Sequence, residues 1–128
     1  MTATLSAAAP LVLRAYYRIL GGGRQAYRDG AAMRGLLGDH LDFTGPLAGR
    51  RPDSTDAFLR GVAGFIDTVG AIDIIQDVHD AHGSAVLHAA TMPGGPMLFA
   101  EFFTLEDSRI VGLRLHYNGP EYLDTGGR

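Results

Sequence analysis

The sequence predicts an α+β fold in which three N-terminal helices pack on one face of a mostly antiparallel sheet. Apolar residues recur at helical spacing in the segment before Gly70, and four strand-like runs follow it. Tight connections around Ala81-His82-Gly83, Gly94-Gly95 and Asp107-Ser108 separate these runs. Helices followed by an antiparallel meander are typical of an α+β domain.

Three segments carry the helical pattern. The first begins at Pro10, which is acceptable in a first helical turn, and ends at Gly21-Gly22-Gly23. The second is expected over residues 25–37. The third follows the potential caps at residues 53–55 and has the clearest periodicity. Its apolar positions are Phe58, Leu59, Val62, Phe65, Ile66 and Val69.

The strands complete one domain over residues 1–128. A short strand at 41–44 leads into the loop 45–49, and the main strands are expected at 72–79, 84–92, 97–105 and 109–117. The Gly-rich, polar segment 118–128 is expected to form a flexible tail.

Composition excludes several kinds of chemistry. The formal net charge is −3 and the basic residues are scattered, which argues against nucleic acid or an anionic membrane as partner. All eleven basic residues are Arg, so a Schiff-base lysine is excluded, and the lack of Cys excludes thiolate nucleophiles and Cys-ligated zinc. The apolar stretch 7–20 is interrupted by Pro10, Arg14 and Arg18, so neither a signal peptide nor a membrane span fits. We therefore expect a cytoplasmic protein.

Glu101 is the most informative residue, because it lies inside the apolar run 97–105 and is one of only three glutamates. An ionised carboxylate is costly to bury without a partner, so a buried Glu101 would be paired, protonated or lining a polar cavity. The competing interpretation places it on a solvent-facing edge or interface.

The preceding hairpin predicts a partner for Glu101. If Gly94-Gly95 is a two-residue loop, Pro93 faces Pro96 and His88 lies directly opposite Glu101. Opposed Cβ atoms are about 5 Å apart, close enough for a His–Glu hydrogen bond. An imidazole paired in this way is oriented and made more basic, as in many general bases.

The last hairpin allows two registers. A two-residue loop at Asp107-Ser108 pairs Glu101 with Arg114 and makes it part of a salt-bridged row. A three-residue bulged loop pairs Glu101 with Leu113, so that Leu113, Leu115 and Tyr117 share its face. A one-residue slip inverts every side chain, so the alternatives are mutually exclusive.

Three segments, residues 15–23 (AYYRILGGG), 41–46 (LDFTGP) and 101–110 (EFFTLEDSRI), together with the element order, resemble the nuclear transport factor 2-like superfamily. The closest similarity is to SnoaL-like polyketide cyclases and ketosteroid isomerases, over about residues 8–118. The resemblance implies a cone-shaped barrel whose strongly curved sheet and helices enclose an apolar cavity, with a homodimer and a bulged last hairpin.

The resemblance also assigns roles to individual residues. Tyr16 falls where ketosteroid isomerases place an oxyanion-hole tyrosine, and Glu101 where they place a protonated aspartic acid that donates to the same oxyanion. Their catalytic Asp base would match Gly45 and is absent, which leaves His88 as the substitute base.

We therefore expect a small, cofactor-independent enzyme that performs proton transfer (isomerisation, cyclisation or dehydration) on a hydrophobic oxygenated ligand such as a polyketide, steroid or terpenoid. Its catalytic residues would be Tyr16, His88 and Glu101. Its cavity would be lined by Phe58, Phe65, Phe99, Phe103, Leu113, Leu115 and Tyr117. The alternative is a non-catalytic ligand-binding or dimeric interaction module on the same fold. No metal is expected, because His82 in the segment 77–82 lies in a turn and no further ligands cluster near it.

Overall fold

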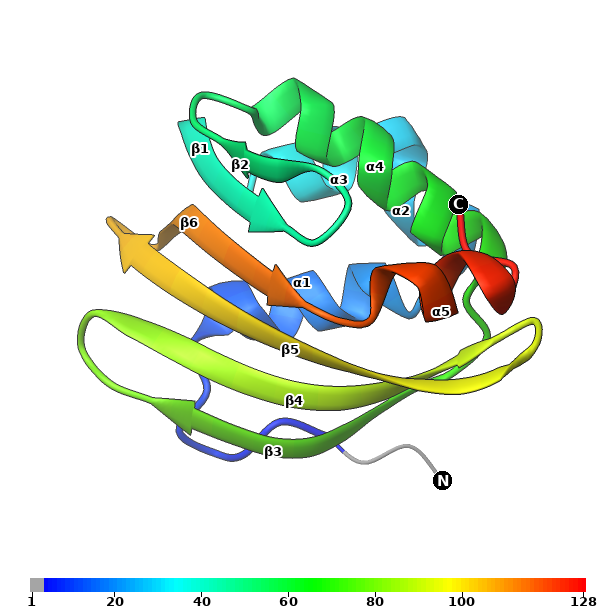
Figure 1. The fold of residues 1–128 in the computed structure, drawn as a ribbon. Helices are drawn as coiled ribbons and strands as arrows, with labels where there is room; N and C mark the ends of the chain where they lie inside the picture. Colours follow the sequence, from blue (N-terminus) through cyan, green and yellow to red (C-terminus); the bar gives the residue numbers. More distant parts are fainter. Residues whose placement is uncertain (1–3) are drawn as a thin grey trace.

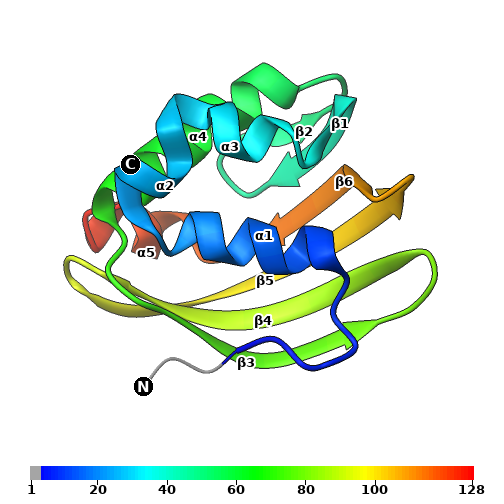
Figure 2. The same ribbon diagram turned by 180° about the vertical axis from the view of Figure 1, so that it is seen from behind.

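The computed structural model describes residues 4–128 and shows a six-stranded, curved sheet with helices on its concave side (Figures 1 and 2). The helices are α1 (Leu11–Leu20), α2 (Gly23–Tyr27), the 3-10 turn η1 (Arg28–Gly30), α3 (Ala31–Arg34), α4 (Thr55–Thr68) and α5 (Gly119–Asp124). The strands are β1 (Leu37–Gly45), β2 (Gly49–Arg51), β3 (Ile72–His79), β4 (Gly83–Met92), β5 (Gly95–Glu106) and β6 (Arg109–His116).

The sheet has the order β2-β1-β6-β5-β4-β3. Every neighbouring pair is antiparallel except β1 and β6, which run parallel. The predicted α+β class and mostly antiparallel sheet are confirmed. The sheet is curved as expected and remains open, with β2 and β3 as its two edges.

Helix α1 lies inside the curve of the sheet, and α4 covers the end formed by β1 and β2 (Figure 1). Both bury an apolar face, and on α4 this face follows the periodicity that the sequence predicts. Buried residues on α1 are Val12, Leu13, Tyr16, Tyr17 and Leu20, and those on α4 include Phe58, Leu59, Val62 and Ile66. These side chains form one core with the inner face of the sheet.

The single helix expected over 25–37 is wrong. The backbone turns left-handed at Arg28, Asp29 and Gly30, which divides the segment into α2, η1 and α3, and β1 begins at Leu37. The break allows Tyr27 to be buried and to donate its hydroxyl to the Leu59 carbonyl. Gly30 has a φ of 95°, a conformation that a glycine adopts without steric cost.

The β4–β5 hairpin turns one residue earlier than expected. Met92 pairs with Gly95, so Pro93-Gly94 forms the loop, and His88 lies opposite Phe99 while Val86 lies opposite Glu101. Pro93 has no N–H to donate to a ladder, which favours its place in the turn. The register moves by two residues, so His88 and Glu101 remain on one face as diagonal neighbours.

The β5–β6 hairpin combines features of both registers considered. Its loop is the two-residue Asp107-Ser108, with φ angles of 51° and 63°. A bulge then shifts the register between Thr104 and Leu105, so Glu101 pairs with Leu115 rather than with Arg114 or Leu113. Because the bulge adds one residue, the inward face is the one predicted for the three-residue loop, and Arg114 is exposed.

The segment expected to be a flexible tail contains helix α5. The Asn118 side chain caps it by accepting a hydrogen bond of 2.8 Å from the Glu121 N–H. Tyr122 is buried and donates its hydroxyl to the Arg128 carbonyl. The short strand β2 was also absent from the sequence expectation. It pairs with β1 through Gly49 and Arg51.

Candidate functional site

Four polar side chains meet inside the fold, from three different elements. Tyr16 and Tyr17 come from α1, His88 from the middle of β4 and Glu101 from the middle of β5. Glu101 is 2% exposed and His88 1% exposed. Glu101 is therefore a buried residue, and the interpretation of a solvent-facing edge is wrong.

Glu101 is the centre of this group. The Tyr16 hydroxyl donates to its Oε2 at 2.7 Å, and the Tyr17 hydroxyl donates to its Oε1 at 2.7 Å. His88 Nε2 lies 3.0 Å from the same Oε1. Three groups that can donate hydrogen bonds thus surround one carboxyl group. Their hydrogen bonds replace those that an ionised carboxylate loses when it is removed from water.

Both tyrosines remain protonated donors over a wide pH range. Burial, and then the nearby Glu101 carboxylate, raise the pKa of Tyr16 and of Tyr17 well above the ordinary value of 10.0. A phenolate in this site would be unfavourable, because burial disfavours its charge and the neighbouring carboxylate repels it. The neutral hydroxyls therefore act as hydrogen-bond donors to Glu101.

His88 is held by aromatic rings as well as by Glu101. Its imidazole stacks on Phe99 with ring centroids 5.3 Å apart, and the ring of Tyr17 packs edge-on at 5.7 Å. Nε2 faces Glu101, whereas Nδ1 is buried and has no hydrogen-bond partner among residues 4–128. Most buried polar atoms have a hydrogen-bond partner, so Nδ1 is the unsatisfied atom of this group.

A cavity of about 450 Å³ reaches this group, and Tyr16, His88 and Glu101 form part of its wall. This volume is in the range of small-molecule sites, roughly 300–1,000 Å³. Five residues predicted to line the cavity do so: Phe58, Phe65, Phe99, Leu115 and Tyr117. Phe103 and Leu113, which were also expected in the wall, lie in the packed core.

Gly45 also lines the cavity, at the position where the sequence resemblance would place a catalytic carboxylate. A Cβ at this position would lie 2.9 Å from the ring of Phe43. The Phe43 ring therefore fills the space that a side chain at position 45 would occupy. Of the side chains in residues 4–128, Glu101 is the one acidic group and His88 the one imidazole in the cavity wall.

Tyr17 was missed in the sequence analysis. The resemblance gave a role to Tyr16, and the next residue was left unassigned. A helix inside a curved sheet buries a wider arc than one lying on a flat sheet, so neighbouring positions can both face protein. Two consecutive tyrosines in an apolar helix are the signal that could have revealed this.

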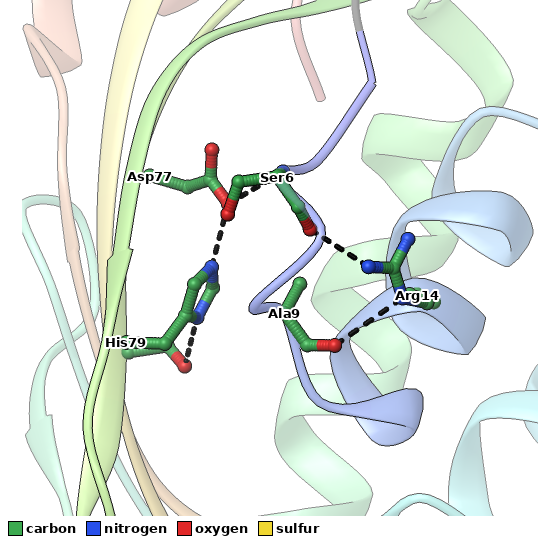
Figure 3. Close-up of polar contacts among 6 residues, drawn as sticks. Ser6, Ala9, Arg14, Asp77 and His79 are labelled. Carbon is green, nitrogen blue, oxygen red and sulfur yellow. Dashed lines mark hydrogen bonds and ion pairs between the residues drawn. The ribbon is translucent and has the colours of Figure 1, made fainter.

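A second polar cluster joins the N-terminal segment to β3 (Figure 3). Asp77 accepts hydrogen bonds from the Ser6 N–H and hydroxyl at 2.9 and 2.8 Å, and lies 2.5 Å from His79 Nε2. His79 Nδ1 in turn lies 2.7 Å from the Ser84 hydroxyl. Within residues 4–128, no group of three or more acidic, His or Cys side chains has an arrangement that could hold a metal ion. This cluster fastens the N-terminal segment to the sheet.

Comparison of the structure with solved proteins identifies the fold. A protein from Kribbella flavida DSM 17836 superposes with a TM-score of 0.78 and 23% identity, covering 94% of each chain. A steroid delta-isomerase from Pseudomonas aeruginosa superposes with a TM-score of 0.70 and 15% identity. The match covers 97% of this chain and 89% of the isomerase. An NTF2-like protein of unknown function from Cytophaga hutchinsonii superposes with a TM-score of 0.64 and 11% identity. The match covers 92% of this chain and 99% of that protein.

This chain therefore has the nuclear transport factor 2-like fold, as the sequence resemblance implied. The sequence matches no family model and no curated protein sequence. No helix within residues 4–128 is long and apolar enough to cross a membrane.

The tyrosines predict an alkaline limit to stability. All five phenols have a pKa raised above 10.0 in the folded protein, that of Tyr117 to about 12. The folded state then holds these protons more tightly than the unfolded state, so the stabilisation is complete below pH 10 and is lost as pH rises through the folded values. Tyr17→Phe should make the free energy of unfolding fall less steeply as the pH rises, because one of the raised phenol groups is removed. We expect an ultraviolet titration to show tyrosinate only as the protein unfolds; tyrosinate forming near pH 10 in a folded protein would contradict this.

Proposed function

We propose that this protein is a small, cofactor-independent enzyme that moves a proton on a hydrophobic, oxygenated ligand held in the cavity. The observation that carries the proposal is His88 Nδ1, a buried nitrogen in a cavity-lining residue with no partner among residues 4–128. Because Nδ1 has almost no surface open to the empty cavity, the His88 ring or its neighbour Phe99 has to shift before a ligand can supply that partner. The isomerase among the structural neighbours supports the same reaction class by likeness of fold.

His88 is the proposed base. With Nε2–H donating to the Glu101 carboxylate, Nδ1 carries the lone pair and accepts a proton from a ligand carbon beside a carbonyl. The electron pair of the broken C–H bond moves to the carbonyl oxygen and gives an enolate. His88 then returns the proton to another carbon in an isomerisation, or to a departing hydroxyl in a dehydration. In a cyclisation the enolate carbon attacks a second carbonyl of the ligand, and His88 gives the proton to the alkoxide that forms.

Glu101 has a different role in this proposal from the one that the resemblance implies. In the described hydrogen bonds it accepts from Tyr16 and Tyr17, whereas an oxyanion donor would be protonated. As a carboxylate it orients His88, fixes its tautomer and stabilises the imidazolium that forms, as in a catalytic triad. Tyr16 lines the cavity, so its hydroxyl can turn from Glu101 to the developing oxyanion.

A non-catalytic binding module is the second candidate. Phe43 fills the position next to Gly45 where a second carboxylate would stand, and Glu101 already has its hydrogen-bond partners inside the protein. In this case the polar group would only hold the fold and bind the ligand's oxygen. Ligand binding without any proton exchange would favour the module.

The expected homodimer and cytoplasmic location are part of the proposal. The outer face of the sheet carries exposed apolar side chains, including Val78 at 57%, Leu98 at 59% and Phe102 at 47% exposure. A second copy packed against this face would remove them from water. Sedimentation velocity should therefore show a dimer that Leu98→Asp dissociates, whereas a monomeric wild-type protein would contradict this assignment.

The proton-transfer proposal predicts hydrogen–deuterium exchange at carbon. In D₂O, a panel of hydrophobic ketones and enones should exchange protons next to the carbonyl faster with the protein than without it, as followed by NMR. His88→Gln should lower that exchange by about 10²–10⁴-fold, the usual contribution of a general base. Glu101→Gln should lower it as well, because the imidazole loses its orienting carboxylate.

His116→Gln is the matched control, because His116 is exposed on the last strand and lies outside the cavity wall. It should leave the exchange rate unchanged. Circular dichroism establishes that each variant is folded. A folded His88→Gln protein that keeps the full exchange rate would contradict the assignment of His88 as the base.

A further inference from the structure

The charged residues of the cavity are distributed unevenly. Among residues 4–128, Glu101 is the only acidic side chain in its wall, while three arginines, Arg51, Arg60 and Arg128, line it as well. The protein as a whole has a formal net charge of −3, so this local excess of positive charge opposes the overall balance. Glu101 lies at the buried end and is occupied by the tyrosines and His88.

The three arginines of the cavity wall are exposed, so they lie where the cavity opens to solvent. Arg51 belongs to β2 and Arg60 to α4, and both are exposed, as are Leu47 and Ala48 of the loop beside them. Figure 1 shows β2 and its loop next to α4. The cavity thus has a buried polar end, apolar walls and a cationic mouth.

Arg51 and Arg60 differ from neighbouring arginines in having no ion pair. Arg50 pairs with Asp42 at 3.0 Å, and Arg34 pairs with Asp56 at 2.6 Å. Arg51 donates one N–H to the Ala48 carbonyl at 3.1 Å, and within residues 4–128 neither Arg51 nor Arg60 contacts a carboxylate within salt-bridge distance.

The acidic residues closest to them in sequence are engaged elsewhere. Asp53 lies 2.7 Å from His40, and Asp56 is held by Arg34. The guanidinium groups at the mouth therefore keep most of their donors free for an outside anion. A guanidinium presents a planar fork of N–H groups that matches a carboxylate, and such charge-assisted bonds are stronger than neutral ones.

We propose that the ligand of this cavity is an amphipathic acid, with an apolar body, an oxygen function at the His88 end and a carboxylate held by Arg51 and Arg60 at the mouth. The apolar body fills the space between Phe58, Phe65 and Leu115, where the wall offers no charge. This inference rests on the proposed function, since it takes the same cavity as the ligand site, and it selects acids over neutral steroids or terpenoids.

Two fluorescent probes test this charge preference. 1-Anilinonaphthalene-8-sulfonate and N-phenyl-1-naphthylamine share one apolar body and differ by a single sulfonate, which stands in for the carboxylate. The wild-type protein should bind the sulfonate at least about tenfold more tightly, as expected for hydrogen bonds to a charged group. The double variant R51Q/R60Q should lose about that factor for the sulfonate and bind the neutral probe as before.

R114Q is the matched control, because Arg114 is exposed and lies outside the cavity wall. It should bind both probes like the wild type, and octanoate should displace the sulfonate from the wild type more effectively than octanol does. Equal affinities for the two probes, no binding of either probe, or an R51Q/R60Q protein that retains the preference would each overturn the inference. The exchange assay with His88→Gln decides the proposed reaction separately, because it does not depend on the ligand's charge.

Discussion

The buried carboxyl group of Glu101 is the constraint on which the rest of the structure depends. An unpaired ion in this position would cost several kcal/mol, so the fold has to bring donors to it. Tyr16 and Tyr17 supply two from α1, and His88 supplies a third from the neighbouring strand. Helix α1 is thereby fixed against the sheet in rotation and in register, since only one rotation directs both hydroxyls to the two carboxyl oxygens.

The same constraint gives the cavity its two different ends. The polar group forms its buried end, and aromatic and aliphatic side chains from α4 and β5 form its walls. In the proposed complex, the ligand's polar atoms bind at His88 and at the arginines of the mouth, because the apolar walls between them offer no charge. The ligand class and the reaction are inferred from these two ends together.

The sequence predicted the face of each strand better than its register. His88 and Glu101 were placed on one face because alternation along a strand is strict, and a shift of two residues preserves it. The shift in the β4–β5 register arises because Pro93-Gly94 forms the loop, whereas the pair Gly94-Gly95 suggested a loop one residue later. The bulge near Thr104 left no recognisable sequence pattern, although it decides whether Leu115 or Arg114 faces Glu101.

Departures from simple periodicity were the least predictable features. The left-handed turn at Arg28 and Asp29 uses residues that are ordinary in helices, so the apolar pattern around it suggested one continuous helix. Helix α5 gains its stability by burying Tyr122, a tertiary contact that local composition does not show. Tyr17 was missed for a similar reason, because its burial depends on the curvature of a sheet formed much later in the chain.

The most direct test of this account is the tautomer of His88, which a long-range ¹H–¹⁵N correlation spectrum reports at a pH where the imidazole is neutral. The account predicts a proton on Nε2, donated to Glu101, and an unprotonated Nδ1, with that preference lost or weakened in Glu101→Gln. A proton on Nδ1, or a mixture of tautomers that Glu101→Gln leaves unchanged, would contradict the claim that Glu101 orients His88 as a base.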